Sequence, residues 1–399
     1  MPAWLITLEK ICKPLVDKLI NNKITNSQFG FKKGSSCSIG KTMIYYKSKK
    51  FKFNKALLID VRKAYDSVDR NILKECIENN FDEEDAAFLN NFIKIYDQLT
   101  MIINNSEIKA TCGLPQGSAL SPIFFNLYIN QALINLNKIN NLSAQAYADD
   151  LILQSNNINT LQKGYDKTIE FYNNLKLHIN GNKSELISDN LNDKIIDKRN
   201  KLEIIAKEDA KYLGQIINCI GVPITDVSFM NFCELLNVTT KEGTLTRIAK
   251  IRLFHIYMKS KINHLIPLIA ITGGIKQLWK TIREIIFKYI LEYSTMPRER
   301  SSVFNLGYYE VILRPVIKFK EKNKKSIIKK LNTIYYFSEI EDLEHQNEIY
   351  IKFEELDDII EKITLIEIKV NNIWKNIQNS HENEVHDSVI NLININKKK

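Results

Sequence analysis

The chain has 399 residues, enough for two or three domains, and its formal net charge of +10 favours a polyanionic partner. Six scattered cysteines without a C-x-x-C pair argue against a zinc site and against a disulfide framework. The sequence contains no signal peptide and no apolar run long enough to span a membrane, so we expect an intracellular protein, nuclear or cytoplasmic.

The first predicted elements are a helix, a loop and a strand that ends on an acid. Residues 5–20 predict a helix with one apolar stripe, made of Leu5, Leu8, Ile11, Leu15 and Leu19. A basic loop with two glycines follows at residues 28–37. Leu57, Leu58 and Ile59 then predict an apolar strand that leads into Asp60. A carboxylate in such a place has a high desolvation cost unless a positive charge meets it.

Helices and turns fill the next part of the chain. Asp69 is placed to cap one amphipathic helix and Asp82 to cap a second. Residues 101–111 predict a hairpin that turns at Asn104 and Asn105. The loop Gly113-Leu114-Pro115-Gln116-Gly117-Ser118 comes next, and an apolar helix then runs from Ser121 to about Leu136.

A second acidic site is Tyr147-Ala148-Asp149-Asp150, which stands between apolar residues that would otherwise form one strand. A helix over 161–172, a strand, a turn at 180–181 and a strand at 185–187 follow. Strand, helices, hairpin, helix and strand is the order of a split βαβ sheet with helices on one face. We therefore expect an α+β fold that brings Asp60 and Asp149 onto neighbouring central strands.

Asp60, Asp149 and Asp150 are the candidate catalytic and metal-binding residues. Two-metal phosphoryl transfer needs hard oxygen ligands that hold two Mg²⁺ ions about 4 Å apart, with Mn²⁺ as an alternative. Asp60 and Asp149 suit bridging positions, whereas strand alternation turns Asp150 to the opposite face or to a supporting place. Each acid alone would be an ordinary turn or cap residue. Their order with the Pro-Gln-Gly loop favours transfer onto a nucleic-acid end.

Tyr65 lies five residues after Asp60. At that spacing its ring could lie beneath the sugar of an incoming nucleotide and exclude a 2′-hydroxyl. The same spacing fits a core tyrosine at the start of the next helix equally well. The neighbouring acids Asp66 and Asp69 are expected to be structural, as a turn acceptor and a helix cap.

Four blocks in order resemble those of reverse transcriptases, with non-LTR (LINE-type) retrotransposon polymerases most alike and group II intron enzymes as the nearest relatives. The blocks are residues 28–34, 60–69, 113–122 and 147–150, within a likeness that spans about 5–220. The resemblance implies an RNA-directed DNA polymerase that uses an RNA template, a DNA or RNA primer and dNTPs. Its right-hand fold would comprise partial fingers (1–55), a palm with fingers elements (56–225), a helical thumb (226–300) and a helical C-terminal extension (301–399).

The same resemblance implies roles for the other site residues. Asp60, Asp149 and Asp150 match the metal-binding triad, and Tyr65 matches the steric gate. The other residues expected at the nucleotide are Lys32, Val61, Gln116 and Gly117, with Gln116 at the nascent base pair. Lys183 matches a lysine near the triphosphate that could act as a general acid for pyrophosphate, although a solvated turn lysine fits as well. Tyr212 and Gly214 lie in a block similar to the primer grip.

The segment 241–300 is predicted to be helical and carries twelve Lys or Arg against four acids. Such a cationic face would hold a template–primer duplex through its phosphates, independently of base sequence. Lys276, Lys280 and Arg283 stand at helical spacing beside Trp279 and form a candidate ridge along the nucleic-acid backbone. Taken singly, each of them is more commonly a solvated surface charge.

The sequence departs from the family at its beginning, because nothing matches the fingers block whose arginine contacts the triphosphate in relatives. This predicts a truncated polymerase, and no endonuclease block or zinc knuckle is recognisable. The alternative function is a catalytically inactive, truncated or co-opted retroelement protein that only binds nucleic acid. A viral RNA-dependent RNA polymerase usually has Gly-Asp-Asp in the hairpin and a small or acidic gate, so Ala148 and Tyr65 argue against it.

Overall fold

The structure is a computed structural model and describes residues 1–103 and 106–224, together with the single positions 256 and 268. Apart from those two positions, the predicted thumb and C-terminal extension lie outside the described residues, and so do Lys276, Lys280 and Arg283. Within the described part, no helix has the length and apolar character needed to cross a membrane.

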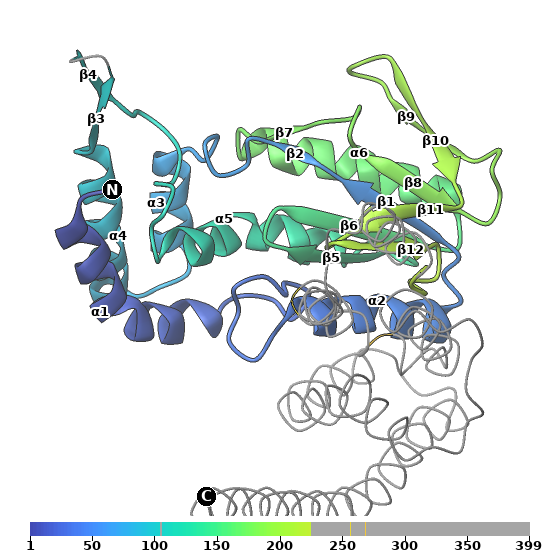
Figure 1. The fold of residues 1–399 in the computed structure, drawn as a ribbon, viewed down its shortest axis with the longest axis horizontal. Helices are drawn as coiled ribbons and strands as arrows, with labels where there is room; N and C mark the ends of the chain where they lie inside the picture. The colour runs from blue at the N-terminus through green and yellow to red at the C-terminus, as the bar shows by residue number, and fades with distance from the viewer. Residues whose placement is uncertain (104–105, 225–255, 257–267, 269–399) are drawn as a thin grey trace, which may run out of the picture.

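A six-stranded sheet forms the centre of the fold, with the strand order β5-β6-β1-β8-β10-β9 (Figure 1). Its strands are β1 (Lys55–Ile59), β5 (Ser143–Tyr147), β6 (Asp150–Ser155), β8 (Glu185–Ser188), β9 (Lys194–Asp197) and β10 (Leu202–Lys207). Strand β1 pairs antiparallel with both β6 and β8, which places Leu57 opposite Leu153 and Leu186. All five residues of β1 are buried, as expected for a strand covered on both faces.

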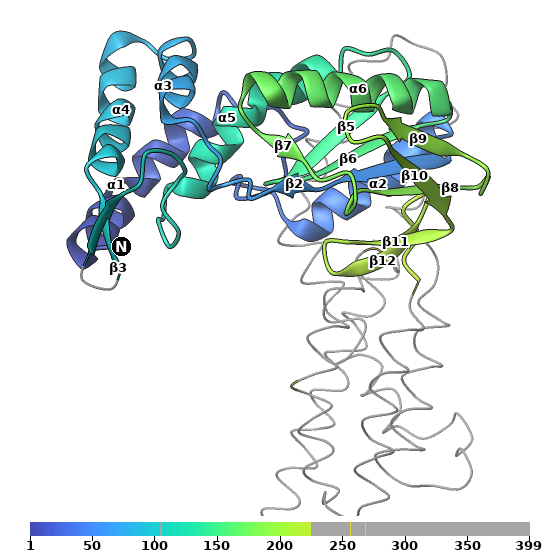
Figure 2. The same cartoon turned by 90° about the horizontal axis from the view of Figure 1, so that it is seen from above.

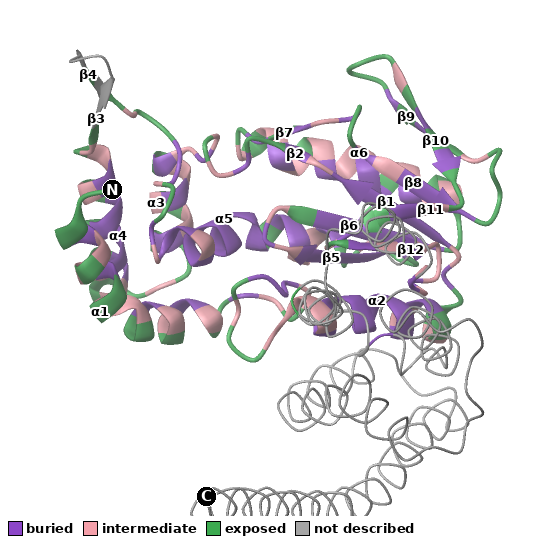
Figure 3. Ribbon diagram, viewed as in Figure 1, coloured by how far each residue is buried: buried purple, intermediate pink, exposed green. Residues whose placement is uncertain are grey.

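One face of this sheet packs against α5 (Ser121–Leu136) and α6 (Ile158–Asn174) (Figure 2). Alternate strand residues, among them Leu57, Leu151 and Leu153, point into the shared core with these helices. Helix α5 is buried along most of its length (Figure 3). Pro122 fits its first turn, because the backbone N–H that proline lacks would have no partner within the helix at this position. The described residues thus confirm the predicted α+β class.

The opposite face is also covered, so the prediction of helices on one face only is wrong. Helix α2 (Cys37–Phe51) and the hairpin of β11 (Asp209–Tyr212) and β12 (Gln215–Asn218) lie against it. Their side chains join strand residues in a second apolar cluster that includes Ile44, Leu58, Ile152, Tyr212 and Ile217. The split βαβ arrangement therefore lies between two layers rather than exposing one side to water.

A further group of helices packs beside α5: α1 (Ala3–Asn21), α3 (Arg70–Glu78) and α4 (Glu83–Asp97). The predicted caps are confirmed. Asp69 accepts hydrogen bonds from two backbone N–H groups of α3, and Asp82 accepts one from α4. The hairpin predicted at 101–111 is formed by β3 (Thr100–Ile103) and β4 (Ser106–Lys109), which pair antiparallel.

Helix α1 is present, but its predicted buried stripe is wrong in part. Ile11 is 72% exposed and Leu15 is 49% exposed, whereas Glu9 is fully buried along with Leu5, Val16 and Ile20. The carboxylate of Glu9 accepts hydrogen bonds from the Tyr96 hydroxyl and from residues just before α5. Because of these bonds, the face of α1 that carries Glu9 is buried, and part of the more continuous leucine stripe is exposed.

Candidate active site

The three predicted acids come together at one edge of the sheet. Asp60 follows β1 and precedes the short strand β2 (Val61–Arg62). Asp149 lies in the turn between β5 and β6, and Asp150 is the first residue of β6. Because Ile59 pairs with Leu151, the end of β1 carries Asp60 to the edge where the hairpin turns. The predicted neighbourhood is confirmed, because β1 and β6 are adjacent strands of the sheet, although Asp60 and Asp149 lie just beyond the ends of these strands rather than within them.

The hairpin turn is tight and its backbone is unusual. Tyr147 pairs with Asp150, which leaves only Ala148 and Asp149 to make the turn. Ala148 has φ of 55°, in the left-handed region where a Cβ is unfavourable and where glycine is the usual residue. A buried alanine held in this conformation needs support from its surroundings.

Burial and the neighbouring acids disfavour the charged forms of Asp149 and Asp150. Burial raises the pKa of the Asp149 carboxyl, and Asp60 raises it further, while a hydrogen bond from its own backbone N–H opposes both. Asp150 is exposed, yet partial desolvation by the surrounding protein and the charges of Asp149 and Asp60 raise its pKa to about 6. No Lys or Arg in residues 1–103 and 106–224 forms an ion pair with any of the three acids.

The donor chemistry of these acids fits a divalent metal. Within the described residues, no three His, Cys, Asp or Glu side chains already have the mutual geometry of a metal site. The acids nevertheless supply hard carboxylate oxygens, the ligands that Mg²⁺ prefers, and they repel one another without a described cation. Asp60, Asp149 and Asp150 are therefore the residues that could hold such ions.

The raised pKa of Asp150 predicts a pH-dependent stability difference. The Asp150 carboxyl binds its proton more tightly in the folded state than in the unfolded state. Its contribution to the free energy of unfolding therefore falls as pH rises from about 4 to above 6. Asparagine mimics the protonated form. Without added metal, Asp150→Asn should therefore raise the melting temperature relative to wild type more at pH 7.5 than at pH 5. An equal difference at both pH values would contradict the raised pKa.

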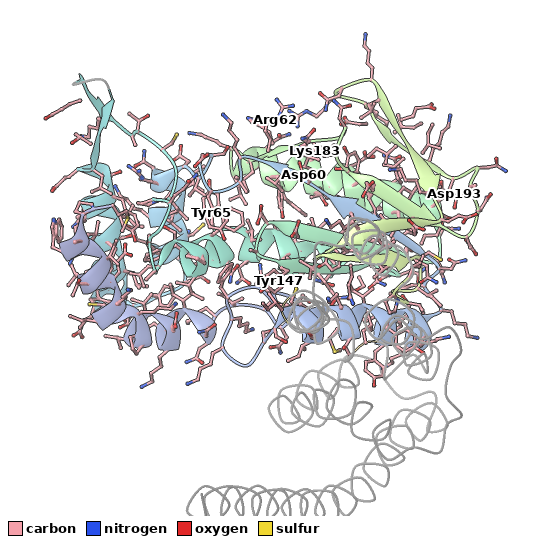
Figure 4. All side chains as sticks on the ribbon, viewed as in Figure 1. Asp60, Arg62, Tyr65, Tyr147, Lys183 and Asp193 are labelled. Carbon is pink, nitrogen blue, oxygen red and sulfur yellow. The ribbon has the colours of Figure 1, made fainter. Side chains whose placement is uncertain are left out.

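The backbone of Asp60 is held by the turn that carries Lys183. Strand β2 pairs with β7 (His178–Ile179), and this places the buried Val61 opposite Ile179. The Asn180 N–H donates to the Asp60 carbonyl at 2.8 Å, and the Asp60 N–H donates to Ser184 Oγ at 3.3 Å. Lys183 is exposed in this same turn, on a segment beside Asp60 (Figure 4).

Tyr65 lies within electrostatic reach of the acids. It is half-buried, and its ring stacks on Phe125 with ring centroids 4.7 Å apart. Burial raises the pKa of its hydroxyl, and the next largest cause is the charge of Asp149. One face of the ring therefore belongs to the core while the hydroxyl feels the charge of Asp149. The core packing of Tyr65 is present, and its role as a steric gate stays a prediction.

The Pro-Gln-Gly loop is anchored at one end and open at the other. A Cβ on Gly113 (φ of 84°) would come within 2.9 Å of the Asp66 carbonyl oxygen, so this residue requires glycine. Gln116 Nε2 donates to Asp66 Oδ1 at 3.3 Å. Gly117 also has positive φ (83°), but a Cβ there would meet no atom within 4 Å. Gln116 and Gly117 thus border open space.

Three other predicted residues have structural environments of their own. The Lys32 ammonium donates to the carbonyl oxygens of Ile24 at 2.6 Å and Thr25 at 2.8 Å. Tyr212 is buried in the second apolar cluster; burial, with the charge of Asp150, raises its hydroxyl pKa. Gly214 (φ of 77°) lies in the β11–β12 turn. These placements leave the predicted nucleotide and primer contacts of Lys32, Tyr212 and Gly214 as predictions.

Two buried polar residues contact the site but were not predicted for it. Gln28 hydrogen-bonds to both polar groups of the Ala148 backbone, and Glu9 accepts bonds from Ser118 and Ala119 beside the Pro-Gln-Gly loop. The sequence does mark Glu9 as unusual, because a lone acid four residues after Leu5 interrupts an otherwise apolar helix face. Gln28 stands inside a recognised block, but nothing in the sequence indicates its partner 120 residues away.

Comparisons with known proteins identify the family of this chain. Residues 5–217 match the family described as reverse transcriptase (RNA-dependent DNA polymerase). The chain is similar to the COX1/OXI3 intron 2 protein of Saccharomyces cerevisiae, with 23% identity over 124 residues, which covers 31% of this chain and 14% of that protein. This chain therefore corresponds to a small part of that relative's length.

Solved structures with some similarity include two yeast telomerases. One is telomerase from Candida albicans in complex with a TWJ fragment of telomeric RNA, with a TM-score of 0.46, 12% identity, and coverage of 82% of this chain and 56% of that chain. The other is apo telomerase from Candida tropicalis, with a TM-score of 0.42, 16% identity, and coverage of 82% and 59%.

Proposed function

Because the chain belongs to the reverse transcriptase (RNA-dependent DNA polymerase) family, we propose that it extends a DNA or RNA primer on an RNA template with dNTPs. The observation that carries this proposal is the meeting of Asp60, Asp149 and Asp150 at one edge of the sheet, with no described cation paired to them. The test is primer extension by the full chain on a primed RNA template with dNTPs and Mg²⁺. Template binding without extension would favour the alternative, a protein that only binds nucleic acid.

In this proposal Asp60 and Asp149 would hold the Mg²⁺ ions, and the exposed Asp150 would support them. When bound, the metal would activate the primer 3′-hydroxyl and stabilise the leaving pyrophosphate. Lys183, exposed beside Asp60, would give a proton to the pyrophosphate. Gln116 and Gly117 border open space and would contact the incoming nucleotide and the nascent base pair.

The proposal extends to the domains and to the source of the enzyme. The six-stranded sheet would be the palm of a right-hand polymerase, and α1, α3 and α4 would contribute fingers elements. The block likeness favours a non-LTR retrotransposon as the source. Similarity to an intron 2 protein supports a second candidate, an intron-encoded reverse transcriptase.

Tyr65→Ala is expected to relax the discrimination against ribonucleotides by about tenfold to a hundredfold, the range that steric rejection of a small group commonly gives. The reason is that in the wild-type chain the Tyr65 ring, fixed against Phe125 near Asp149, would occupy the space of a 2′-hydroxyl, and alanine leaves this space empty. The measurement is the ratio of kcat/KM for dNTP and rNTP. Tyr65→Phe keeps the ring and should keep the ratio. Unchanged discrimination in Tyr65→Ala would make Tyr65 a core residue only.

A further inference from the structure

The loop between α1 and α2 lies along the hairpin that carries the acids (Figure 1). The Phe29 N–H donates to the Ala146 carbonyl at 2.8 Å, and the Ala146 N–H donates to the Ser27 carbonyl at 2.9 Å. These bonds join the loop to β5 in an isolated parallel bridge between Gln28 and Ala146. The residue between them, Gln28, is therefore placed beside the Asp149 turn by the backbone itself.

The Gln28 side chain binds the left-handed residue of that turn from both sides. Gln28 Oε1 accepts a hydrogen bond from the Ala148 N–H at 3.0 Å, and Gln28 Nε2 donates to the Ala148 carbonyl at 3.3 Å. The same Oε1 also accepts from the Gly30 N–H at 2.9 Å. Gln28 is only 1% exposed, so water cannot replace these bonds without an opening of the structure.

Close packing around this amide leaves the turn little freedom. A Cβ on Gly30 would lie 2.3 Å from the Ala148 nitrogen, so only glycine lets the loop approach the turn this closely. The Gly30 carbonyl in turn accepts a hydrogen bond from Asn126 Nδ2 of α5 at 2.6 Å. The turn is thus linked through Gln28 and Gly30 to the helix that covers the sheet.

We propose that Gln28 is a positioning residue, which holds Ala148 in its left-handed conformation and thereby fixes where Asp149 and Asp150 point. Alanine does not favour φ of 55° by itself, and Asp149 is the very next residue in the chain. A shift of about 1 Å in a catalytic group can lower a rate about a hundredfold. The catalytic half of this proposal rests on the proposed polymerase function, whereas the holding of the turn does not.

Gln28→Met tests the proposal because methionine keeps the length and apolar volume of the side chain but removes all three hydrogen bonds. The matched control is Gln154→Met. Gln154 is fully buried in β6 and also makes three side-chain hydrogen bonds, to Ser48, Gln145 and the Ile44 carbonyl, but none to the turn. Adding Ala148→Gly to Gln28→Met provides a rescue, since glycine adopts positive φ without support.

With Mg²⁺ and a primed RNA template, Gln28→Met should lower kcat about tenfold to a hundredfold with little change in KM for the template–primer. Gln154→Met should lower thermal stability but keep kcat within about twofold, and Ala148→Gly should restore at least part of kcat in the Gln28→Met background. If Gln28→Met does not fold, Gln28→Glu replaces it. This variant keeps an accepting oxygen but loses the Nε2 donor, so it should also lower kcat relative to wild type. Equal losses of kcat in Gln28→Met and Gln154→Met, or no rescue, would overturn the proposal.

Amide hydrogen exchange of the peptide that covers residues 146–150 separates this proposal from the polymerase function. Exchange there should be faster in Gln28→Met than in wild type, and unchanged in Gln154→Met. If the wild-type chain shows no extension, the proposed function fails while this exchange result still decides the role of Gln28. Unchanged exchange in Gln28→Met would overturn that role.

Discussion

Asp149→Asn is expected to abolish primer extension while leaving binding of the RNA template nearly unchanged. The substitution keeps the size of the side chain and the shape of the turn but removes the charge that would bridge two metal ions. The loss of several kcal/mol of transition-state stabilisation corresponds to about a thousandfold or more in rate. Template binding should survive because phosphate contacts of basic residues, rather than the acids, carry affinity for nucleic acid.

The experiment measures single-nucleotide extension and template affinity on the same preparations of wild type and variant. Asp166→Asn is a suitable control, because Asp166 is on α6 with its carboxylate bonded to Gln162 and takes no part in the proposed site. It should extend the primer at the wild-type rate. Substantial extension by Asp149→Asn would show that the two-metal assignment is wrong, even if the chain proved to be a polymerase.

Removal of the negative charge of Asp149 should also change the free energy of unfolding. Burial and Asp60 disfavour the charged form of Asp149, so without metal the Asn variant should be at least as stable as wild type at neutral pH. A variant that is more stable yet inactive is typical of a site whose residues serve chemistry at some expense of stability. A destabilised Asp149→Asn variant would instead indicate that lost activity reflects unfolding.

Elements with local signals were predictable from the sequence. Asp69 and Asp82 cap helices by bonding to N–H groups two or three residues away, so the sequence alone contains both partners. The acidic hairpin and the strand before Asp60 were predictable because apolar runs end abruptly on carboxylates. The pairing of β1 with β6 then followed from the order of the elements and needed no knowledge of side-chain contacts.

Helix α2 was not predicted, because it is buried around most of its circumference and carries polar residues on the buried positions. Lys41, Thr42 and Ser48 are buried beside Met43 and Ile44, so no clear apolar stripe marks the helix. Its start does carry one local signal, an N-cap serine: Ser36 accepts a hydrogen bond from the Ile39 N–H. Because α2 was not among the predicted elements, the sequence did not indicate that the second face of the sheet is covered.

The supports of the candidate site were beyond prediction for a different reason. The contacts of Gln28 with Ala148 span 120 residues, and those of Glu9 span 87 to 110. Both residues are polar and buried. The interrupted apolar face of the first helix marks Glu9 as unusual, but a single sequence shows the partners of neither residue. The acids were identifiable by their own pattern, whereas the contacts that hold their surroundings are visible only in the fold.

Glu9→Leu is expected to lower the free energy of unfolding by about 3–5 kcal/mol, because it removes the acceptor of three hydrogen bonds in a buried place. Glu9 Oε1 accepts from the Tyr96 hydroxyl at 2.7 Å and from Ser118 Oγ at 2.9 Å, and Oε2 accepts from the Ala119 N–H at 2.7 Å. Leucine fills similar space but leaves these donors without their acceptor in a buried place, where each unsatisfied group costs about 1–3 kcal/mol. The measurement is urea unfolding of the full chain.

Tyr96→Phe is the matched control, since it removes one of the three donors and keeps the ring in the core. It should cost only about 1 kcal/mol, the usual net contribution of one hydrogen bond. The difference between the two variants measures what Glu9 does for Ser118 and Ala119. If Glu9→Leu cost no more than Tyr96→Phe, the carboxylate would not organise this part of the chain.

A larger loss in Glu9→Leu would have a consequence for the site, because Ser118 begins the link from the Pro-Gln-Gly loop to α5. Ser118 Oγ donates to Glu9 and accepts from the N–H groups of Leu120 and Ser121, which fixes the start of α5. Gln116 and Gly117 directly precede this anchor. Glu9→Leu should therefore raise KM for dNTP in folded protein below its unfolding temperature, whereas Tyr96→Phe should leave KM near the wild-type value. A stability loss without any change in KM would make Glu9 a support of the helices alone.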